Sequence, residues 1–123
     1  VAMKLLLQDT YPSWLDMTRG KTTLPEQWNG EKSQNHCMFG SVDGILYSML
    51  AGIKVDREIE IAPYFAEEVD HVCAATELAG GKITVEWTRE SKEITLRISI
   101  EGDAEVKYND TVLRVGEHIF KNL

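Results

Sequence analysis

The sequence contains few basic residues for its size. Its 123 residues include 13 Lys and Arg against 20 Asp and Glu, which gives a formal net charge of -7 at pH 7. Nucleic acids and anionic membrane surfaces are bound through basic patches. No hydrophobic stretch approaches the roughly 18 residues of a membrane-spanning helix. We therefore expect neither nucleic acid nor a membrane among its partners.

Cysteines and metal-binding patterns are also scarce. The two cysteines, Cys37 and Cys73, form no CxxC pair, and their apolar neighbours predict two buried free thiols. The acidic run at residues 67–70 lacks the loop geometry of a calcium site. His71 and His118 have no partner at the spacing of metal ligands, so we interpret both as structural or exposed residues. The sequence thus predicts no metal and no cofactor.

The apolar residues change their spacing near residue 53. Before it they recur at the steps of one helix face, and the members of this face are Phe39, Val42, Ile45, Leu46, Met49, Leu50 and Ile53. Beyond it they alternate with polar residues in segments 81–90 and 92–102, as in half-buried antiparallel strands. Shorter strands are expected at residues 59–61, 69–77, 104–108, 111–115 and 117–120. We predict an α+β fold, with residues 1–53 ending an α-helical domain and residues 54–123 forming a small antiparallel β-sandwich.

The sequence predicts where a first helix ends and where a later helix begins. The first residues, VAMKLLLQD, fit the last turns of an amphipathic helix with Leu5 and Leu6 turned inward. Because the sequence begins in mid-helix, we expect a piece of a larger chain. Ser33 or Asn35 is the expected N-cap of the later helix, since both side chains can accept a backbone N–H.

A long polar segment separates these helical stretches. Residues 11–37 make a loop of about 25 residues, and ordered loops of such length are usually functional. Within it, Glu26 stands two residues before Trp28 and ten before His36. Aromatic rings beside carboxylates are typical of sugar sites, because C–H faces stack on indole while hydroxyls take hydrogen bonds. From the pattern alone, a solvated surface carboxylate is the more frequent interpretation of Glu26.

Two segments carry a resemblance to a known family. LLLQDTYPSWLDMTRGKTTLPEQW (residues 5–28) and SQNHCMFGSVDGILYSMLAGI (residues 33–53) resemble the C-terminal end of α-L-rhamnosidases of glycoside hydrolase family 78. In that family a YPSW-like segment, a TT-L-x-E-x-W loop and an NHxMFGS helix start precede a small C-terminal β-sandwich. The resemblance runs in order over nearly the whole chain. It implies the closing helices of an (α/α)6 catalytic barrel, followed by a C-terminal β-sandwich domain.

The same resemblance implies roles for two residues, and two tryptophans lie near them in the sequence. Glu26 matches the general base of an inverting hydrolase, and His36 matches a histidine that contacts rhamnose hydroxyls. Trp28 and Trp14 are further candidate sugar contacts, with a loop-buttressing role and a packed turn as their respective alternatives. Inversion requires a second carboxyl group about 6.5–9.5 Å away. The resemblance places this general acid upstream, in a part of the barrel that the chain does not contain.

These expectations combine into one hypothesis about function. The chain is expected to belong to an enzyme that releases terminal α-L-rhamnose from a rhamnose-containing oligosaccharide or glycoside. Its partner in catalysis would be the upstream part of the same barrel, so the 123 residues alone are expected to be inactive. Two alternatives stay open: a non-catalytic carbohydrate-binding module, and a β-sandwich with a structural role.

Overall fold

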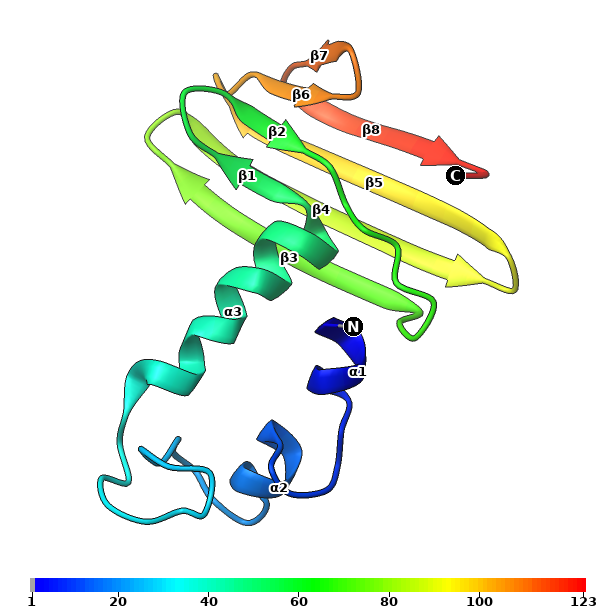
Figure 1. Ribbon diagram of the computed structural model, residues 1–123. Helices are drawn as coiled ribbons and strands as arrows, with labels where there is room; N and C mark the ends of the chain where they lie inside the picture. The colour runs from blue at the N-terminus through cyan, green and yellow to red at the C-terminus, as the bar shows by residue number, and fades with distance from the viewer. Residues whose placement is uncertain (1) are drawn as a thin grey trace. The chain divides into compact units, whose positions relative to one another are not determined.

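The computed structural model describes residues 2–123, without the side chain of Ala2 (Figure 1). The chain forms two compact units, residues 1–44 and residues 45–123. The boundary between the units therefore falls inside the later helical run. The predicted domain boundary between residues 53 and 54 stays a prediction.

The first unit holds short helices joined by ordered loops. Helix α1 spans Ala2–Leu6 and helix α2 spans Trp14–Thr18. Ser13 is buried and caps α2, because its Oγ accepts the Asp16 backbone N–H at 3.0 Å. Helix α2 lies within the predicted 11–37 loop, so the expectation of a loop without a helix was wrong. The expected inward position of Leu5 was also wrong: Leu5 is exposed and Met3 is buried.

The later helical run changes its winding along its length. It begins as a 3-10 helix, η1 (Cys37–Ser41), continues as α3 (Val42–Ile45) and ends with wider π-helical turns, η2 (Leu46–Ala51). The N-cap is His36, which corrects the expectation of Ser33 or Asn35. The run ends at Gly52, which has a φ of 71°. Ile53 therefore begins a strand and does not belong to the helix face.

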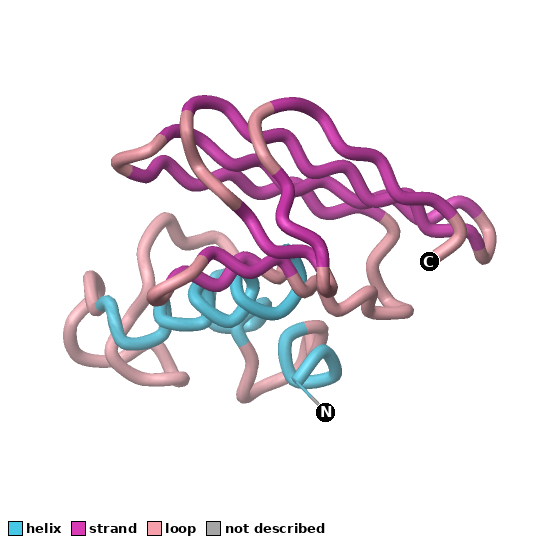
Figure 2. The backbone as a smooth tube through the Cα atoms, turned by 90° about the horizontal axis from the view of Figure 1, so that it is seen from above, coloured by secondary structure: helices cyan, strands magenta, loops and turns pink. Residues whose placement is uncertain are grey.

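Two four-stranded sheets make up the β part of the second unit. One has the order β1 (Ile53–Val55), β2 (Ile59–Ile61), β6 (Val106–Tyr108), β7 (Thr111–Leu113). The other has the order β3 (His71–Leu78), β4 (Gly81–Glu90), β5 (Glu93–Gly102), β8 (Gly116–Lys121). The long strands of this second sheet run side by side (Figure 2). All pairs are antiparallel except β2 with β6, which is parallel and departs from the all-antiparallel expectation.

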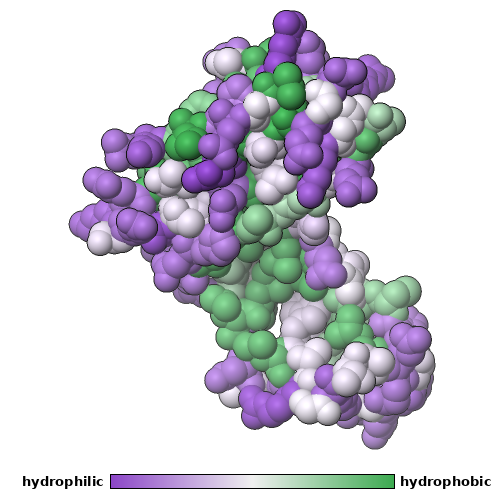
Figure 3. Space-filling model, turned by 180° about the vertical axis from the view of Figure 1, so that it is seen from behind, coloured by the Kyte–Doolittle hydropathy of each residue, from purple (hydrophilic) through white to green (hydrophobic). Residues whose placement is uncertain are grey.

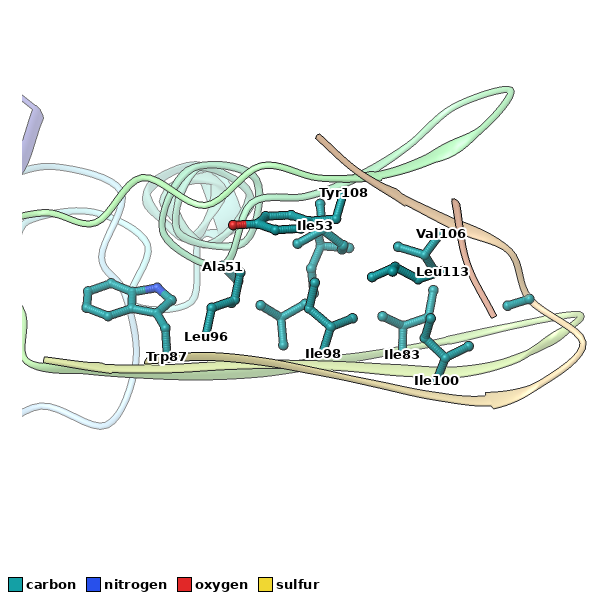
Figure 4. Packing of buried hydrophobic residues seen from close by; sticks show 13 residues of the cluster. Ala51, Ile53, Ile83, Trp87, Leu96, Ile98, Ile100, Val106, Tyr108 and Leu113 are labelled. Atoms are coloured by element: carbon teal, nitrogen blue, oxygen red, sulfur yellow. The ribbon is translucent and has the colours of Figure 1, made fainter. Parts of the chain in front are cut away.

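The core lies between the two sheets (Figure 4). Alternate residues in the middle of β4 and β5 point into it, and these buried residues are Ile83, Val85, Trp87, Leu96, Ile98 and Ile100. They are the apolar residues of the predicted alternation, because successive strand side chains point to opposite faces. The facing sheet contributes Ile53, Ile61, Val106, Tyr108 and Leu113. The predicted helical part followed by a small β-sandwich is thus confirmed.

Within the second unit, the end of the helical run is bonded to the sandwich. The indole N–H of buried Trp87 donates to the Leu50 carbonyl at 2.8 Å, and the ring meets Phe65 edge-on. The Gly52 carbonyl accepts the Ala62 backbone N–H at 2.9 Å. These bonds satisfy polar groups that would otherwise be buried without partners.

One face of the sandwich is mostly polar. On the face seen in Figure 3, hydrophilic residues predominate over the sheets and hydrophobic residues lie scattered between them. Cys37 and Cys73 are free but exposed, so the prediction of buried thiols was wrong. Cys73 is exposed because it lies at an outward position of β3, an edge strand. Among the described residues, no helix has the length and apolar character needed to cross a membrane.

Candidate active site

The loop that carries Glu26 closes on itself through two backbone hydrogen bonds. The Glu26 N–H donates to the Ser33 carbonyl at 2.8 Å, and the His36 N–H donates to the Leu24 carbonyl at 2.8 Å. Segments 24–26 and 33–36 therefore run side by side. Residues separated by ten positions in sequence are thereby brought to one end of a single closed loop.

Glu26 lies in a depression of the first unit. Its side chain is half-buried, and Oε2 lies 3.5 Å from the Ser33 backbone nitrogen, at the long limit of a hydrogen bond. The depression has a volume of about 400 Å³ and is lined by Tyr11, Glu26, Gln27, Trp28, Asn29, Met38 and Phe39. Glu26 is the one carboxylate among these described lining residues. A ligand there would meet one acid or base group, two amides and an apolar wall.

The two ring nitrogens of His36 have different roles. Nδ1 accepts the Met38 backbone N–H at 3.4 Å and so caps η1. An acceptor nitrogen carries no proton, which places the proton of the neutral ring on Nε2. Nε2 is then a hydrogen-bond donor that the cap does not use. This arrangement suits contact with a hydroxyl group of a ligand.

The two tryptophans form a cluster with Phe39. The centroids of the Trp14 and Trp28 rings lie 5.0 Å apart with an edge-on geometry, and Trp28 lies 4.3 Å from Phe39. The Trp14 indole N–H donates to the Phe39 carbonyl at 3.0 Å. Trp14 is therefore engaged in packing, while Trp28 also lines the depression beside Glu26. A sugar contact by either ring stays a prediction.

Two exposed apolar residues of the depression were not predicted from the sequence. Tyr11 and Met38 are 62% and 51% exposed, although both line the depression that contains Glu26. Met38 carried an available signal, because it lies two residues after His36 in the conspicuous NHCMFGS segment. Tyr11 is distant from Glu26 in sequence, and only the folding of the chain brings it to the same depression.

Two sequence families match this chain one after the other. Residues 1–50 match the bacterial alpha-L-rhamnosidase 6 hairpin glycosidase domain. Residues 57–116 match the bacterial alpha-L-rhamnosidase C-terminal domain. The chain belongs to the bacterial α-L-rhamnosidase family. It carries the last helices of the catalytic barrel and the C-terminal β-sandwich domain of an α-L-rhamnosidase.

Curated relatives bear the same family name. An α-L-rhamnosidase of Streptomyces avermitilis is 30% identical over 116 residues, which cover 81% of this chain and 11% of the relative. Those of Alteromonas sp. strain LOR and Formosa agariphila are each 26% identical, over 79% and 97% of this chain. The matches cover 12% and 15% of these two relatives. The chain thus spans a small part of the length of the α-L-rhamnosidases that it matches.

Solved structures share the fold. The α-L-rhamnosidase from Dictyoglumus thermophilum superposes with a TM-score of 0.78 at 24% identity, covering 98% of this chain and 18% of that one. The Streptomyces avermitilis α-L-rhamnosidase complexed with L-rhamnose superposes with a TM-score of 0.84 at 24% identity, covering 98% and 16%. The arrangement of helices followed by a β-sandwich is therefore that of this part of an α-L-rhamnosidase.

Proposed function

We propose that the chain is part of an inverting α-L-rhamnosidase that releases terminal α-L-rhamnose from rhamnosides. In this proposal Glu26 is the general base and His36 contacts the sugar. The observation that carries the proposal is the position of Glu26, the one carboxylate among the described residues lining an aromatic-walled depression. Membership of the family makes a glycoside the appropriate substrate class.

The proposed chemistry assigns Glu26 one proton transfer. Its carboxylate takes a proton from water while the water oxygen bonds to the anomeric carbon. The glycosidic bond breaks on the opposite face, and the leaving oxygen receives a proton from a second carboxyl group about 6.5–9.5 Å away. No other described residue of the depression is a carboxylate. The general acid is therefore proposed to come from the upstream part of the same barrel.

The local contacts suit a base that remains in place during catalysis. The 24–36 loop is closed by bonds on both sides of the carboxylate, and the ring cluster of Trp14, Trp28 and Phe39 packs beside it. Rigid support of a catalytic group maintains its distance and orientation to the reacting atoms. The Nε2 donor of His36 would hydrogen-bond a rhamnose hydroxyl.

The proposed base is tested in the full-length enzyme that carries this segment. Glu26→Gln keeps the shape of the side chain but removes the base, so kcat on 4-nitrophenyl α-L-rhamnoside should fall roughly 10²–10⁴-fold. Glu31→Gln is the matched control, because Glu31 is an exposed carboxylate of the same loop outside the depression. Near-normal turnover by Glu26→Gln would contradict the assignment.

A separate measurement tests whether the reaction inverts the anomeric carbon. Proton NMR during the first turnovers should show β-L-rhamnose as the initial product, because attack opposite the leaving group inverts the anomeric carbon. Initial release of α-L-rhamnose would rule out the inverting mechanism while leaving the substrate class intact.

A further inference from the structure

Met38 is an exposed apolar residue that is hydrogen-bonded to one proposed functional residue and shares a depression with the other. It is 51% exposed and lines the depression that contains Glu26. Its backbone N–H donates to Nδ1 of His36 at 3.4 Å. The Ser41 hydroxyl donates to the Met38 carbonyl at 2.8 Å, so the backbone of Met38 is held on both sides of its side chain. The thioether chain therefore faces the depression from an anchored backbone.

The position of the base indicates which part of a substrate this wall meets. An inverting base lies on the face of the sugar opposite the leaving group. Side chains that share a depression with the base therefore contact the sugar that is released, not the aglycone. Met38 and Tyr11 are exposed apolar members of the wall beside Glu26. An apolar wall in this position is complementary to an apolar part of the sugar.

L-Rhamnose has one apolar substituent, the methyl group at C6, which replaces the hydroxymethyl group of L-mannose. We propose that Met38, with Tyr11 beside it, packs against this C6 methyl and makes the site selective for 6-deoxy sugars. The inference rests on the proposed function. Methionine suits the role because its unbranched, polarisable side chain adapts to a small apolar group. Hydroxylation at C6 would bury a hydroxyl group against the thioether without a hydrogen-bond partner.

The experiment compares two substrates in the full-length enzyme. The aryl α-L-rhamnoside and the aryl α-L-mannoside differ only by the hydroxyl group on C6. The unaltered enzyme should prefer the rhamnoside, and Met38→Gln should reduce the ratio of the two kcat/KM values by roughly 10-fold or more. Met38→Leu should keep most of the preference, because leucine restores an apolar side chain of similar volume.

Controls separate this proposal from the assignment of the base. Leu15→Gln alters another exposed apolar residue of the first unit, outside the depression, and should leave the ratio unchanged. Glu26→Gln should slow both substrates by the same factor. If that variant turns over normally while Met38→Gln still lowers the ratio, the assignment of the base fails and the methyl contact stands.

Three outcomes would overturn the methyl contact. The first is an equal loss on both substrates in Met38→Gln, which would indicate a purely structural role. The second is an unchanged preference in that variant. The third is an enzyme that cleaves neither glycoside, which would overturn the proposed function as well. Thermal unfolding of each variant monitors the fold.

Discussion

His36 uses one ring nitrogen to cap a helix, and we propose that the other contacts the sugar. Nδ1 accepts the Met38 backbone N–H, which ties the orientation of the ring to the start of η1. A change at this position is therefore expected to affect stability through Nδ1 and the proposed sugar contact through Nε2. Substitutions that keep only one of the two functions can separate them.

We expect His36→Asn and His36→Ala to differ in stability but not in activity. Asparagine is a good N-cap acceptor, so His36→Asn should keep the free energy of unfolding, whereas His36→Ala should lose about 1 kcal/mol. Neither side chain reaches the position of Nε2. Both variants of the full-length enzyme should therefore lose roughly 10-fold in kcat/KM on the rhamnoside, as expected for one hydrogen bond.

Urea unfolding and steady-state kinetics measure the two effects. Loss of stability in both variants would mean that His36 is not simply a cap. Full activity in His36→Asn would mean that Nε2 makes no contact with the sugar.

At the level of elements, the helical run and the sandwich are joined through Gly52. Its φ of 71° lies in the left-handed region, which ends the helical run after Ala51. A Cβ placed on Gly52 would lie 2.1 Å from the Pro63 nitrogen and 2.2 Å from the Ala62 carbonyl carbon. Gly20 has nearly the same φ, 70°, but a Cβ there would have no neighbour within 4 Å. Both glycines therefore have a left-handed backbone that would strain another residue, but only at Gly52 would an added Cβ meet neighbouring atoms.

This pair predicts a measurable difference in stability. Gly20→Ala should cost about 1–2 kcal/mol of unfolding free energy, from the left-handed backbone alone. Gly52→Ala should cost roughly 2–5 kcal/mol, because the backbone of residues 62–63 must also move. Urea unfolding of the 123-residue chain, followed by tryptophan fluorescence and by circular dichroism, compares the variants. Equal losses would show that the helix end, and not its contact with residues 62–63, sets the cost.

At the scale of the whole molecule, the first unit is proposed to supply one part of an active site. Glu26 is the single carboxylate among the described residues that line the depression. Several large apolar side chains of the same unit are exposed outside the depression, namely Leu5, Leu7 and Leu15. The chain also spans only 11% to 15% of the length of its curated relatives. The upstream part of the barrel is the proposed source of the missing acid.

We therefore expect the isolated 123 residues to release no 4-nitrophenol from the aryl rhamnoside. One carboxylate cannot both activate water and protonate the leaving group in an inverting reaction. Steady turnover by the isolated chain, abolished by Glu26→Gln, would contradict the expectation.

A titration of the same chain with L-rhamnose tests the alternative of a non-catalytic sugar-binding module. Saturable quenching of tryptophan fluorescence would favour that module, and its absence would favour an incomplete catalytic site. Because Trp28 lines the depression and Trp87 is buried in the sandwich, Trp28→Phe identifies the origin of any signal.

The sequence was sufficient for those features that depend on local pattern. The alternation through Ile83, Val85 and Trp87 predicted the buried face of β4, because side chains in a strand have a period of two. The segments around Glu26 and His36 carried the resemblance to the family, and the family matches over residues 1–50 and 57–116 agree with it. The division into a helical part and a β-sandwich followed from the change of apolar spacing.

Other features were decided only by contacts between residues far apart in the chain. Two examples depend on which strand edges pair with each other. One is the parallel pairing of β2 with β6, and the other is the strand that begins at Ile53. The end of the helical run depends on Gly52 packing against Ala62 and Pro63. The placement of Tyr11 and Met38 beside Glu26 depends on the closed loop. Sequence periodicity records which face of an element is apolar, but the neighbour that covers that face is chosen by the tertiary structure.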